Sequence, residues 1–276
     1  MNKKTILVFS IILTIFLMIG AVSAGGWFDF LGDNQSKAND DKTFIVGIGG
    51  DFPPFLYKNN GEYTGFDIEL AKEVAKRNNW TIKFQEVIDW DTKEFELNSN
   101  EIDCIWSELT INGRENNYTW SEPYFNNSQK FVVKSNSSIN SIDDLNGKVV
   151  EVIVSSSASN SLDGANKTIK DTFAKINEVN DYDSAFLDLK SGMCDAIVCD
   201  DVYASYVINE KFSGDSLKII DEPLSYEQYG IGFKKGNDDL RDQVQKTLDE
   251  MYKDGTIDRI AQNYSEYKVP ENVIHP

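Results

Sequence analysis

The feature that most restricts the fold of this chain is a regular alternation of strand-like and helix-like segments. Runs rich in β-branched and aromatic residues alternate with stretches whose apolar residues recur at helical spacing. Such alternation is typical of an α/β fold with mostly parallel sheets. We predict strands at residues 44–50, 81–87, 103–109, 129–134, 148–154, 176–179, 194–199 and 217–220, and helices at residues 66–75, 92–98, 141–145, 159–173, 182–189 and 240–251.

The first 24 residues have the composition of an export signal. Lys3 and Lys4 precede an apolar stretch at residues 6–19, and small residues end the segment at Ala24. The stretch is shorter than the roughly 20 apolar residues that span a membrane. We therefore expect a signal peptide at residues 1–24, with an uncleaved anchor as the alternative. Residues 25–43 are polar and glycine-containing, which predicts a flexible tether.

The charge of the chain excludes some classes of partner. Cleavage after residue 24 would remove two lysines and no acid from 27 basic and 45 acidic residues, leaving a net charge of −20. Such acidity disfavours binding to nucleic acid or to anionic membranes. We expect an exported monomer at the periplasmic or extracellular face of the membrane, either free or held there by its N-terminus.

The cysteines and the single histidine limit the possible chemistry. Cys104, Cys194 and Cys199 do not form a disulfide framework, and their strand-like surroundings predict small buried apolar side chains. His275, next to the C-terminus, is the only histidine. A histidine base is therefore excluded from a central site, and no motif suggests a metal or a cofactor.

Two short motifs suggest a binding site for a zwitterion. Asp51 and Phe52 follow the first predicted strand, and Thr110 and Arg114 lie on one turn after the strand at 103–109. Arginine binds a carboxylate with two parallel hydrogen bonds, and a neighbouring hydroxyl adds another donor. An anion clamp, an aromatic wall and an acid together suit a free amino acid.

These motifs, in this order and behind an export signal, resemble the solute-binding proteins of polar amino-acid ABC transporters, the bacterial extracellular solute-binding protein family 3. The resemblance covers residues 44–267. It implies a two-lobed periplasmic-binding-protein (Venus flytrap) α/β fold of type 2, with a mainly parallel sheet flanked by helices in each lobe. The implied boundaries are residues 44–131 plus 224–276 for lobe 1 and 132–223 for lobe 2, with hinge strands at 130–134 and 223–230.

The resemblance also implies where the ligand's backbone groups bind. Arg114 and Thr110 would hold the α-carboxylate, although the turn between them is one residue shorter than in many members of the family. Ser156 and Ser157 would complete the carboxylate site when the lobes close. Asp200 would receive the α-ammonium group.

The same resemblance places aromatic side chains around the ligand's side chain. Phe52 and Trp90 match two aromatics that enclose it in many relatives. Tyr124 and Gln129 are further candidates at the edge of the site.

Two acids bear on which amino acid is bound. Asp51 stands where relatives that bind lysine, arginine or ornithine place an acid, and Glu108 stands where a small residue is common. If Glu108 points inward, a basic amino acid becomes the better ligand; if it points outward, it is a solvated charge. We expect a polar amino acid, with a lean towards a cationic one.

The function implied by the resemblance is that of the extracytoplasmic substrate-binding subunit of an ABC importer. The protein would deliver its ligand to a membrane permease, and a separate subunit would be the ATPase, because the chain has no glycine-rich nucleotide loop. We expect no enzymatic activity. One alternative is an exported enzyme on the same fold, such as a cyclic-acid dehydratase that uses Asp51, Glu108 or Asp200 as acid or base; another is a ligand-sensing domain.

Overall fold

A computed structural model describes residues 42–212 and 217–276. The predicted signal peptide and nearly all of the predicted tether lie outside these residues. In the described part of the chain, no helix is long and apolar enough to cross a membrane.

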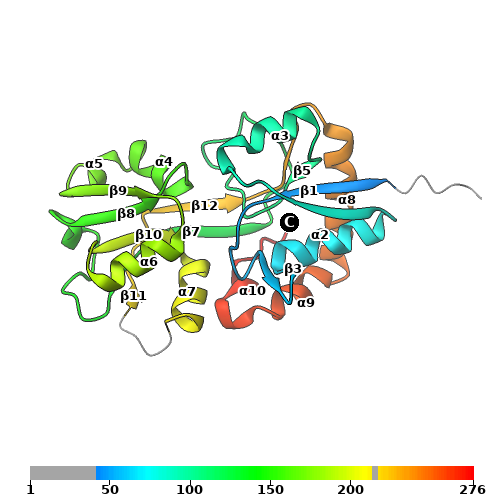
Figure 1. Cartoon of the computed structure of the whole chain (residues 1–276). Coiled ribbons are helices and arrows are strands. Elements are labelled where there is room, and N and C mark those ends of the chain that lie inside the picture. Colours follow the sequence, from blue (N-terminus) through cyan, green and yellow to red (C-terminus); the bar gives the residue numbers. More distant parts are fainter. Residues whose placement is uncertain (1–41, 213–216) are drawn as a thin grey trace, which may run out of the picture. The chain divides into compact units, whose positions relative to one another are not determined.

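The first sheet is built around β1 (Thr43–Ile48), with the strand order β4-β1-β5-β13-β6 (Figure 1). β1 pairs in parallel with β4 (Thr81–Glu86) and β5 (Cys104–Ile105). β13 (Gly232–Phe233) is antiparallel to both β5 and β6 (Thr119–Trp120). A small separate hairpin joins β2 (Tyr57–Asn59) and β3 (Glu62–Thr64).

The second sheet has the order β11-β7-β10-β8-β9. β8 (Val149–Ile153) pairs in parallel with β9 (Lys175–Val179) and β10 (Ala196–Asp200). β7 (Phe125–Lys134) is antiparallel to β10 and to β11 (Leu217–Ile219). Parallel pairing is thus confined to part of each sheet, and the pairing is more mixed than the alternation predicted.

Helices cover both faces of the first sheet because their apolar residues recur on one side. In α2 (Phe66–Arg77), the side chains of Phe66, Leu70 and Val74 lie four residues apart and are buried. They join one apolar core with residues of α8 (Asp238–Lys253), α9 (Thr256–Gln262) and α10 (Val269–Asn272). The opposite face of the sheet packs against α3 (Lys93–Ser99), which follows the 3-10 helix η1 (Trp90–Thr92).

The second sheet is covered in the same way, because successive strand residues face opposite sides. Phe131 and Val133 pack in one cluster with α4 (Ser157–Asp163) and α5 (Lys167–Lys170). Val132, between them, packs in another cluster with α6 (Tyr182–Ser191) and α7 (Asp201–Glu210). Two further 3-10 helices are η2 (Asp143–Leu145) and η3 (Ser265–Tyr267).

The chain passes between the two sheets along two neighbouring strands. β7 follows β6 of the first sheet, and β12 (Ser225–Tyr229) precedes β13 of that sheet (Figure 1). The two strands pair antiparallel, from Gln129 opposite Ser225 to Phe125 opposite Tyr229. The residue boundaries of the two lobes remain a prediction.

Several predicted elements differ in extent from the observed ones, and β7 begins four residues before the strand predicted at 129–134. The helix predicted at residues 159–173 is two helices, because α4 ends at Asp163 and the next residue, Gly164, has a φ of −110° and a ψ of −105°, which are not helical. The strand predicted at 103–109 is the shorter β5, and Glu108, with a φ of 41°, could not belong to an extended strand. The helix at 240–251 is part of α8, which α9 and α10 follow.

The three cysteines are buried and free, as the sequence predicts. Burial raises the pKa of the Cys104 and Cys199 thiols well above the ordinary value, so both stay neutral.

Candidate functional site

The carboxyl ends of strands from both sheets meet at one cavity of about 640 Å³. Residues that follow β1 and β5 line it from the first sheet, and residues at the ends of β8 and β10 line it from the second. Ligands of open α/β sheets bind beyond the carboxyl ends of the strands. The cavity is therefore where this fold is expected to hold a small molecule.

The structure brings most of the predicted site residues together around this cavity. Those that line it are Asp51, Phe52, Trp90, Glu108, Thr110, Arg114, Ser156, Ser157 and Asp200. Tyr124 and Gln129 are not among the lining residues. Both are buried and donate hydrogen bonds to carboxyl groups instead: the Tyr124 hydroxyl donates to Asp67, and the Gln129 amide donates to Asp200.

Arg114 supplies a cation on the first-sheet side of the cavity. A tight turn, in which the Arg114 N–H donates to the carbonyl of Ile111 and Gly113 has a φ of 80°, brings its side chain back towards Thr110. Its Nη1 donates to the carbonyl of Thr110 at 3.2 Å. No carboxylate in the described residues forms an ion pair with the guanidinium, so most of its donors are left for an anionic ligand.

The loop between β8 and α4, with Ser155, Ser156 and the first helical residue Ser157, lines the cavity from the side of the second sheet. Ser155 has a φ of 56°, and the Ser156 hydroxyl caps α4 by accepting from the N–H of Ser159 at 3.1 Å. The Ser157 hydroxyl accepts from the Gln129 amide at 3.0 Å. Each serine oxygen thus has a structural partner, and each hydroxyl hydrogen is still free to be donated to a ligand.

Asp200 supplies an acid at the second-sheet side. Its Oδ1 accepts three hydrogen bonds, from the amides of Asn127 and Gln129 and from the Tyr229 hydroxyl at 2.5 Å. Among the described residues, its Oδ2 has only a long contact, 3.4 Å from the Tyr182 hydroxyl. Burial and the neighbouring Glu227 raise the pKa of Asp200 to about 7. The oxygen without a short bond is the one available to a cation.

Glu108 is the second acid, and its side chain is turned inward. The Ser107 hydroxyl donates to its Oε1 at 2.7 Å, and its N–H donates to Asp67 at 2.8 Å. Its Oε2 is buried and has no partner among the described residues. Burial, together with the charges of Asp67 and Asp200, raises the pKa of Glu108 well above its ordinary value.

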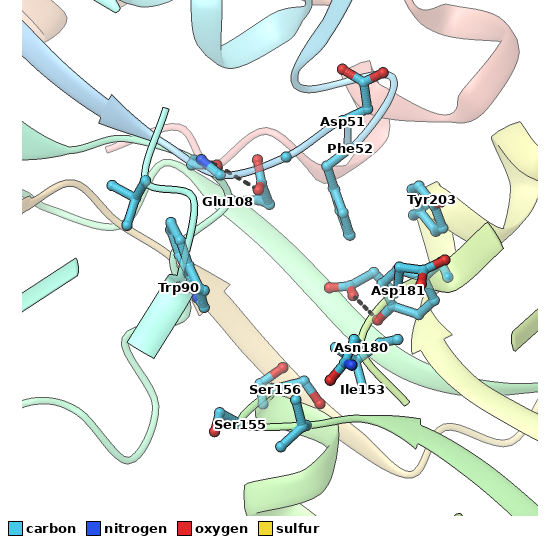
Figure 2. Close-up of a pocket in the computed structure, with 18 of the residues that line it drawn as sticks. Asp51, Phe52, Trp90, Glu108, Ile153, Ser155, Ser156, Asn180, Asp181 and Tyr203 are labelled. Carbon is cyan, nitrogen blue, oxygen red and sulfur yellow. Dashed lines mark hydrogen bonds between the residues drawn. The ribbon is translucent and has the colours of Figure 1, made fainter. Parts of the chain in front are cut away.

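The two acids that bear on specificity are placed differently. In Figure 2, Glu108 lies between Trp90 and Phe52, whereas the carboxyl group of Asp51 points away from the other labelled side chains. Asp51 is exposed to solvent. The inward alternative for Glu108 is therefore the one observed, and Asp51 belongs to the rim.

Comparison with known proteins decides the family of this fold and site. The family described as bacterial extracellular solute-binding proteins, family 3, matches residues 44–267. This chain belongs to that family. The match covers both sheets, apart from Thr43 at the start of β1, and every residue that lines the cavity.

Among curated family 3 relatives, the probable amino-acid-binding protein YxeM of Bacillus subtilis (strain 168) is 32% identical over 273 residues, covering 96% of this chain and 95% of the relative. The L-cystine-binding protein TcyJ of Escherichia coli (strain K12) is 30% identical and covers 83% of this chain and 85% of its own.

Solved structures show the same fold, that of type 2 periplasmic binding proteins. An ancestral arginine-binding protein bound to arginine is 38% identical with a TM-score of 0.72, covering 80% of this chain and 97% of its own. A substrate-binding protein of an ABC uptake transporter from Streptococcus pneumoniae with bound histidine is 30% identical with a TM-score of 0.77, covering 84% and 96%. An ancestral amino-acid-binding protein, a precursor of cyclohexadienyl dehydratase, is 29% identical with a TM-score of 0.70, covering 80% and 94%.

Three of the aromatic rings that line the cavity of this family 3 protein, those of Phe52, Tyr182 and Tyr203, pack against one another. The sequence motifs identified only Phe52 of these three. The ring of Phe52 stacks on Tyr203 with centroids 4.4 Å apart, and Tyr182 lies 4.7 Å from Tyr203. Tyr182 follows a strand of the second sheet and Tyr203 lies one turn after Asp200, so the strand-end rule could have found both. Phe52 thus contacts residues that follow strands of the other sheet.

The buried acids behind the lining are the residues that sequence reasoning missed. Glu227, on β12, is 5% exposed, and its Oε1 accepts from the amides of Asn127 and Gln129. No motif distinguishes it, because its role arises only from the pairing of β12 with β7. The described residues contain no group of three or more histidines, cysteines or acids arranged to hold a metal ion.

Proposed function

We propose that this protein is the extracytoplasmic substrate-binding subunit of an amino-acid ABC importer. It binds one free polar amino acid, preferentially a cationic one, between its two lobes and delivers it to a membrane permease. The observation that carries this proposal is the placement of an unpaired guanidinium, Arg114, and an available carboxylate oxygen of Asp200 on one cavity. Opposite charges that have no ion-pair partner among the described residues fit a zwitterion.

The backbone groups of the ligand have natural partners. The α-carboxylate pairs with Arg114 and accepts further hydrogen bonds from the hydroxyls of Thr110, Ser156 and Ser157, all of which line the cavity. The α-ammonium pairs with Oδ2 of Asp200. Arg114 and Thr110 follow a strand of the first sheet, whereas the serines and Asp200 lie at strand ends of the second.

The preference for a cationic side chain rests on Glu108. A buried carboxyl oxygen without a partner is costly, because it has lost water and gained no hydrogen bond. A guanidinium or ammonium on the ligand side chain would supply the missing donor, while the aromatic faces of Trp90 and Phe52 favour a cation between them. Asp51 acts at the rim, where water screens its charge.

Delivery follows from closure of the lobes. The ligand bridges groups from both sheets, so it stabilises the closed form over the open one. The strands β7 and β12, which connect the sheets, are the hinge of this motion. The permease would recognise the closed form, and a separate ATPase subunit would power import.

An enzyme on the same fold is the second candidate, and one observation favours it. Asp200, with a pKa of about 7, has the acidity that a general acid or base needs near neutral pH. The similarity to an ancestral binding protein described as a precursor of a dehydratase points in the same direction. The charge clamp for a zwitterion favours binding over turnover.

Calorimetric titration of the ligand-stripped protein with each of the twenty amino acids tests the proposal. We expect one-to-one binding in the micromolar range or tighter (roughly −8 kcal/mol), strongest for arginine, lysine or ornithine if the latter is added to the panel. Silence across the panel would refute the amino-acid proposal. Incubation with cyclic hydroxy acids, followed by mass spectrometry for loss of water, tests the enzyme candidate.

A further inference from the structure

Asp200 shares its buried surroundings with a second carboxyl group, that of Glu227 on β12. The side-chain amide nitrogen of Asn127 is 2.6 Å from Oδ1 of Asp200 and 2.6 Å from Oε1 of Glu227. The amide nitrogen of Gln129 is 2.9 Å and 2.8 Å from the same two oxygens. Oδ1 of Asp200 and Oε1 of Glu227 each lie 2.6 Å from the Asn127 nitrogen, so the distance between these two oxygens is at most twice 2.6 Å.

The available donors do not satisfy two ionised carboxylates. The Gln129 NH₂ group contacts three oxygens, those of Asp200, Glu227 and Ser157, with only two hydrogens. Asp200 is 7% exposed and Glu227 5%, so water contributes little. In the described part of the chain, no lysine, arginine or histidine forms an ion pair with either carboxyl group. Repulsion between two like charges at this separation in a buried site makes the pair retain one proton to a higher pH than an isolated carboxyl group would.

The other groups around the pair do not supply the missing positive charge. Hydroxyls approach Asp200 from β12, α6 and α7, and the acid Glu108 faces it from the loop after β5. The nearest basic residue on β7 is already paired with the first acid of α7, at 2.9 Å. The groups concerned are Tyr229, Tyr182, Tyr203, Cys199, Glu108, Asp67, Asp181, Asp183, and the ion pair Lys130–Asp201, with Arg114 on the same cavity.

We infer that Asp200 and Glu227 hold one proton between them in the ligand-free protein, and that the ligand's ammonium group displaces this proton to solvent. Glu227 is then a positioning residue: it does not touch the ligand, but it makes ligand affinity depend on pH. The inference rests on the proposed function, because the amino acid supplies the ammonium. Charge balances, since one ammonium ion enters as one proton leaves.

The direction of the pH dependence follows from the pKa of Asp200, which burial and Glu227 raise to about 7. An ammonium in contact with the carboxylate lowers that pKa in the complex. Below pH 7, binding must therefore release a proton, and affinity falls by up to about tenfold per pH unit. Above pH 7 the carboxylate is already ionised and affinity is constant. We expect L-arginine to bind about tenfold more weakly at pH 6.0 than at pH 8.5.

Calorimetry of the purified protein with L-arginine, in two buffers of different ionisation enthalpy, counts the protons released. The wild type should release about one proton at pH 6.0 and almost none at pH 8.5. Glu227→Gln removes the neighbouring charge, so it should release fewer protons at pH 6.0 than the wild type does. The difference in affinity between pH 6.0 and pH 8.5 should then be about threefold or less. Glu178→Gln, at an exposed position of β9, is the matched control and should behave as the wild type.

A second variant separates this proton from one held near the ligand's side chain. Glu108→Gln should weaken L-arginine binding but keep the proton release that Glu227→Gln reduces. If instead the release disappears in Glu108→Gln and persists in Glu227→Gln, the proton belongs to the other carboxyl pair and the inference is wrong.

A measurement on the ligand-free protein keeps the two proposals distinguishable. Carbon-13 NMR of the side-chain carboxyl groups should show a group besides Asp67 that titrates near pH 7 in the wild type, and the pH at which this group titrates should be lower in Glu227→Gln. If no such carboxyl group is found, or if the affinity for L-arginine does not change with pH, the shared proton is refuted and the amino-acid proposal is left intact. A failure of every amino acid to bind at pH 8.5 refutes the proposed function, and the displacement step with it.

Discussion

Replacing Glu108 by glutamine tests most directly whether the pocket selects a cationic amino acid. Glutamine keeps an oxygen that accepts from the Ser107 hydroxyl, at 2.7 Å in the wild type, but it places an amide where the unpartnered Oε2 stands. A hydrogen bond to a charged group contributes about 1.5–3 kcal/mol. Loss of this contact should therefore weaken L-arginine binding by about 10- to 150-fold.

The neutral analogue L-glutamine provides the internal comparison. Its side chain carries no charge for Glu108 to bind, so its affinity in Glu108→Gln should stay within about threefold of the wild-type value. Calorimetry with both ligands at pH 8.0 gives the selectivity ratio directly. Asp51→Asn is the matched control: Asp51 is exposed, and a solvent-screened charge contributes at most about 1 kcal/mol. Equal losses for both ligands in Glu108→Gln, or a larger loss in Asp51→Asn, would refute the assignment of Glu108 to the ligand's side chain.

Three further outcomes are expected. Arg114→Ala should weaken binding of every amino acid by about 2–5 kcal/mol, because it leaves the α-carboxylate unpaired, and calorimetry showing unchanged affinity would remove Arg114 from the site. Asp67→Asn should flatten the pH dependence of stability. Burial raises the pKa of Asp67 to about 7, so the wild-type free energy of unfolding falls by up to about 1.4 kcal/mol per pH unit as pH rises from 4 to 7. Urea unfolding of both proteins at pH 5 and pH 8 measures this difference. Gly65→Ala should impair folding, since a Cβ at its φ of 120° would lie 2.2 Å from the carbonyl oxygen of Phe55; a thermal midpoint equal to that of the wild type would contradict this.

The local motifs predicted the cavity lining well because each lies at the end of a strand. Once residues 44–50, 103–109, 148–154 and 194–199 are recognised as strands of parallel sheets, their following residues must gather at one edge. Arg114, Ser156 and Asp200 were placed by this rule together with the family resemblance. The shorter turn before Arg114 does not take it away from the cavity, since Arg114 and Thr110 both line it.

The interior behind the lining could not be predicted in this way. Glu227 meets Asp200 only because β12 pairs with β7 in one register, which puts Asn127 opposite Glu227. A polar segment such as residues 225–229 gives no indication of burial in its sequence. The inward orientation of Glu108 likewise depends on its left-handed backbone and on Asp67, 41 residues away, which accepts its N–H.

The two buried carboxyl pairs give the ligand-free protein a common property. Asp67 with Glu108, and Asp200 with Glu227, are like charges without a basic partner among the described residues, and each pair has at least one member whose pKa burial raises. Folding must therefore retain protons on these groups or lose stability as they ionise. A ligand with two cationic groups can compensate both pairs, whereas a neutral amino acid compensates only the pair at Asp200. Selectivity for a cationic ligand then arises partly from relief of repulsion that the empty protein already contains.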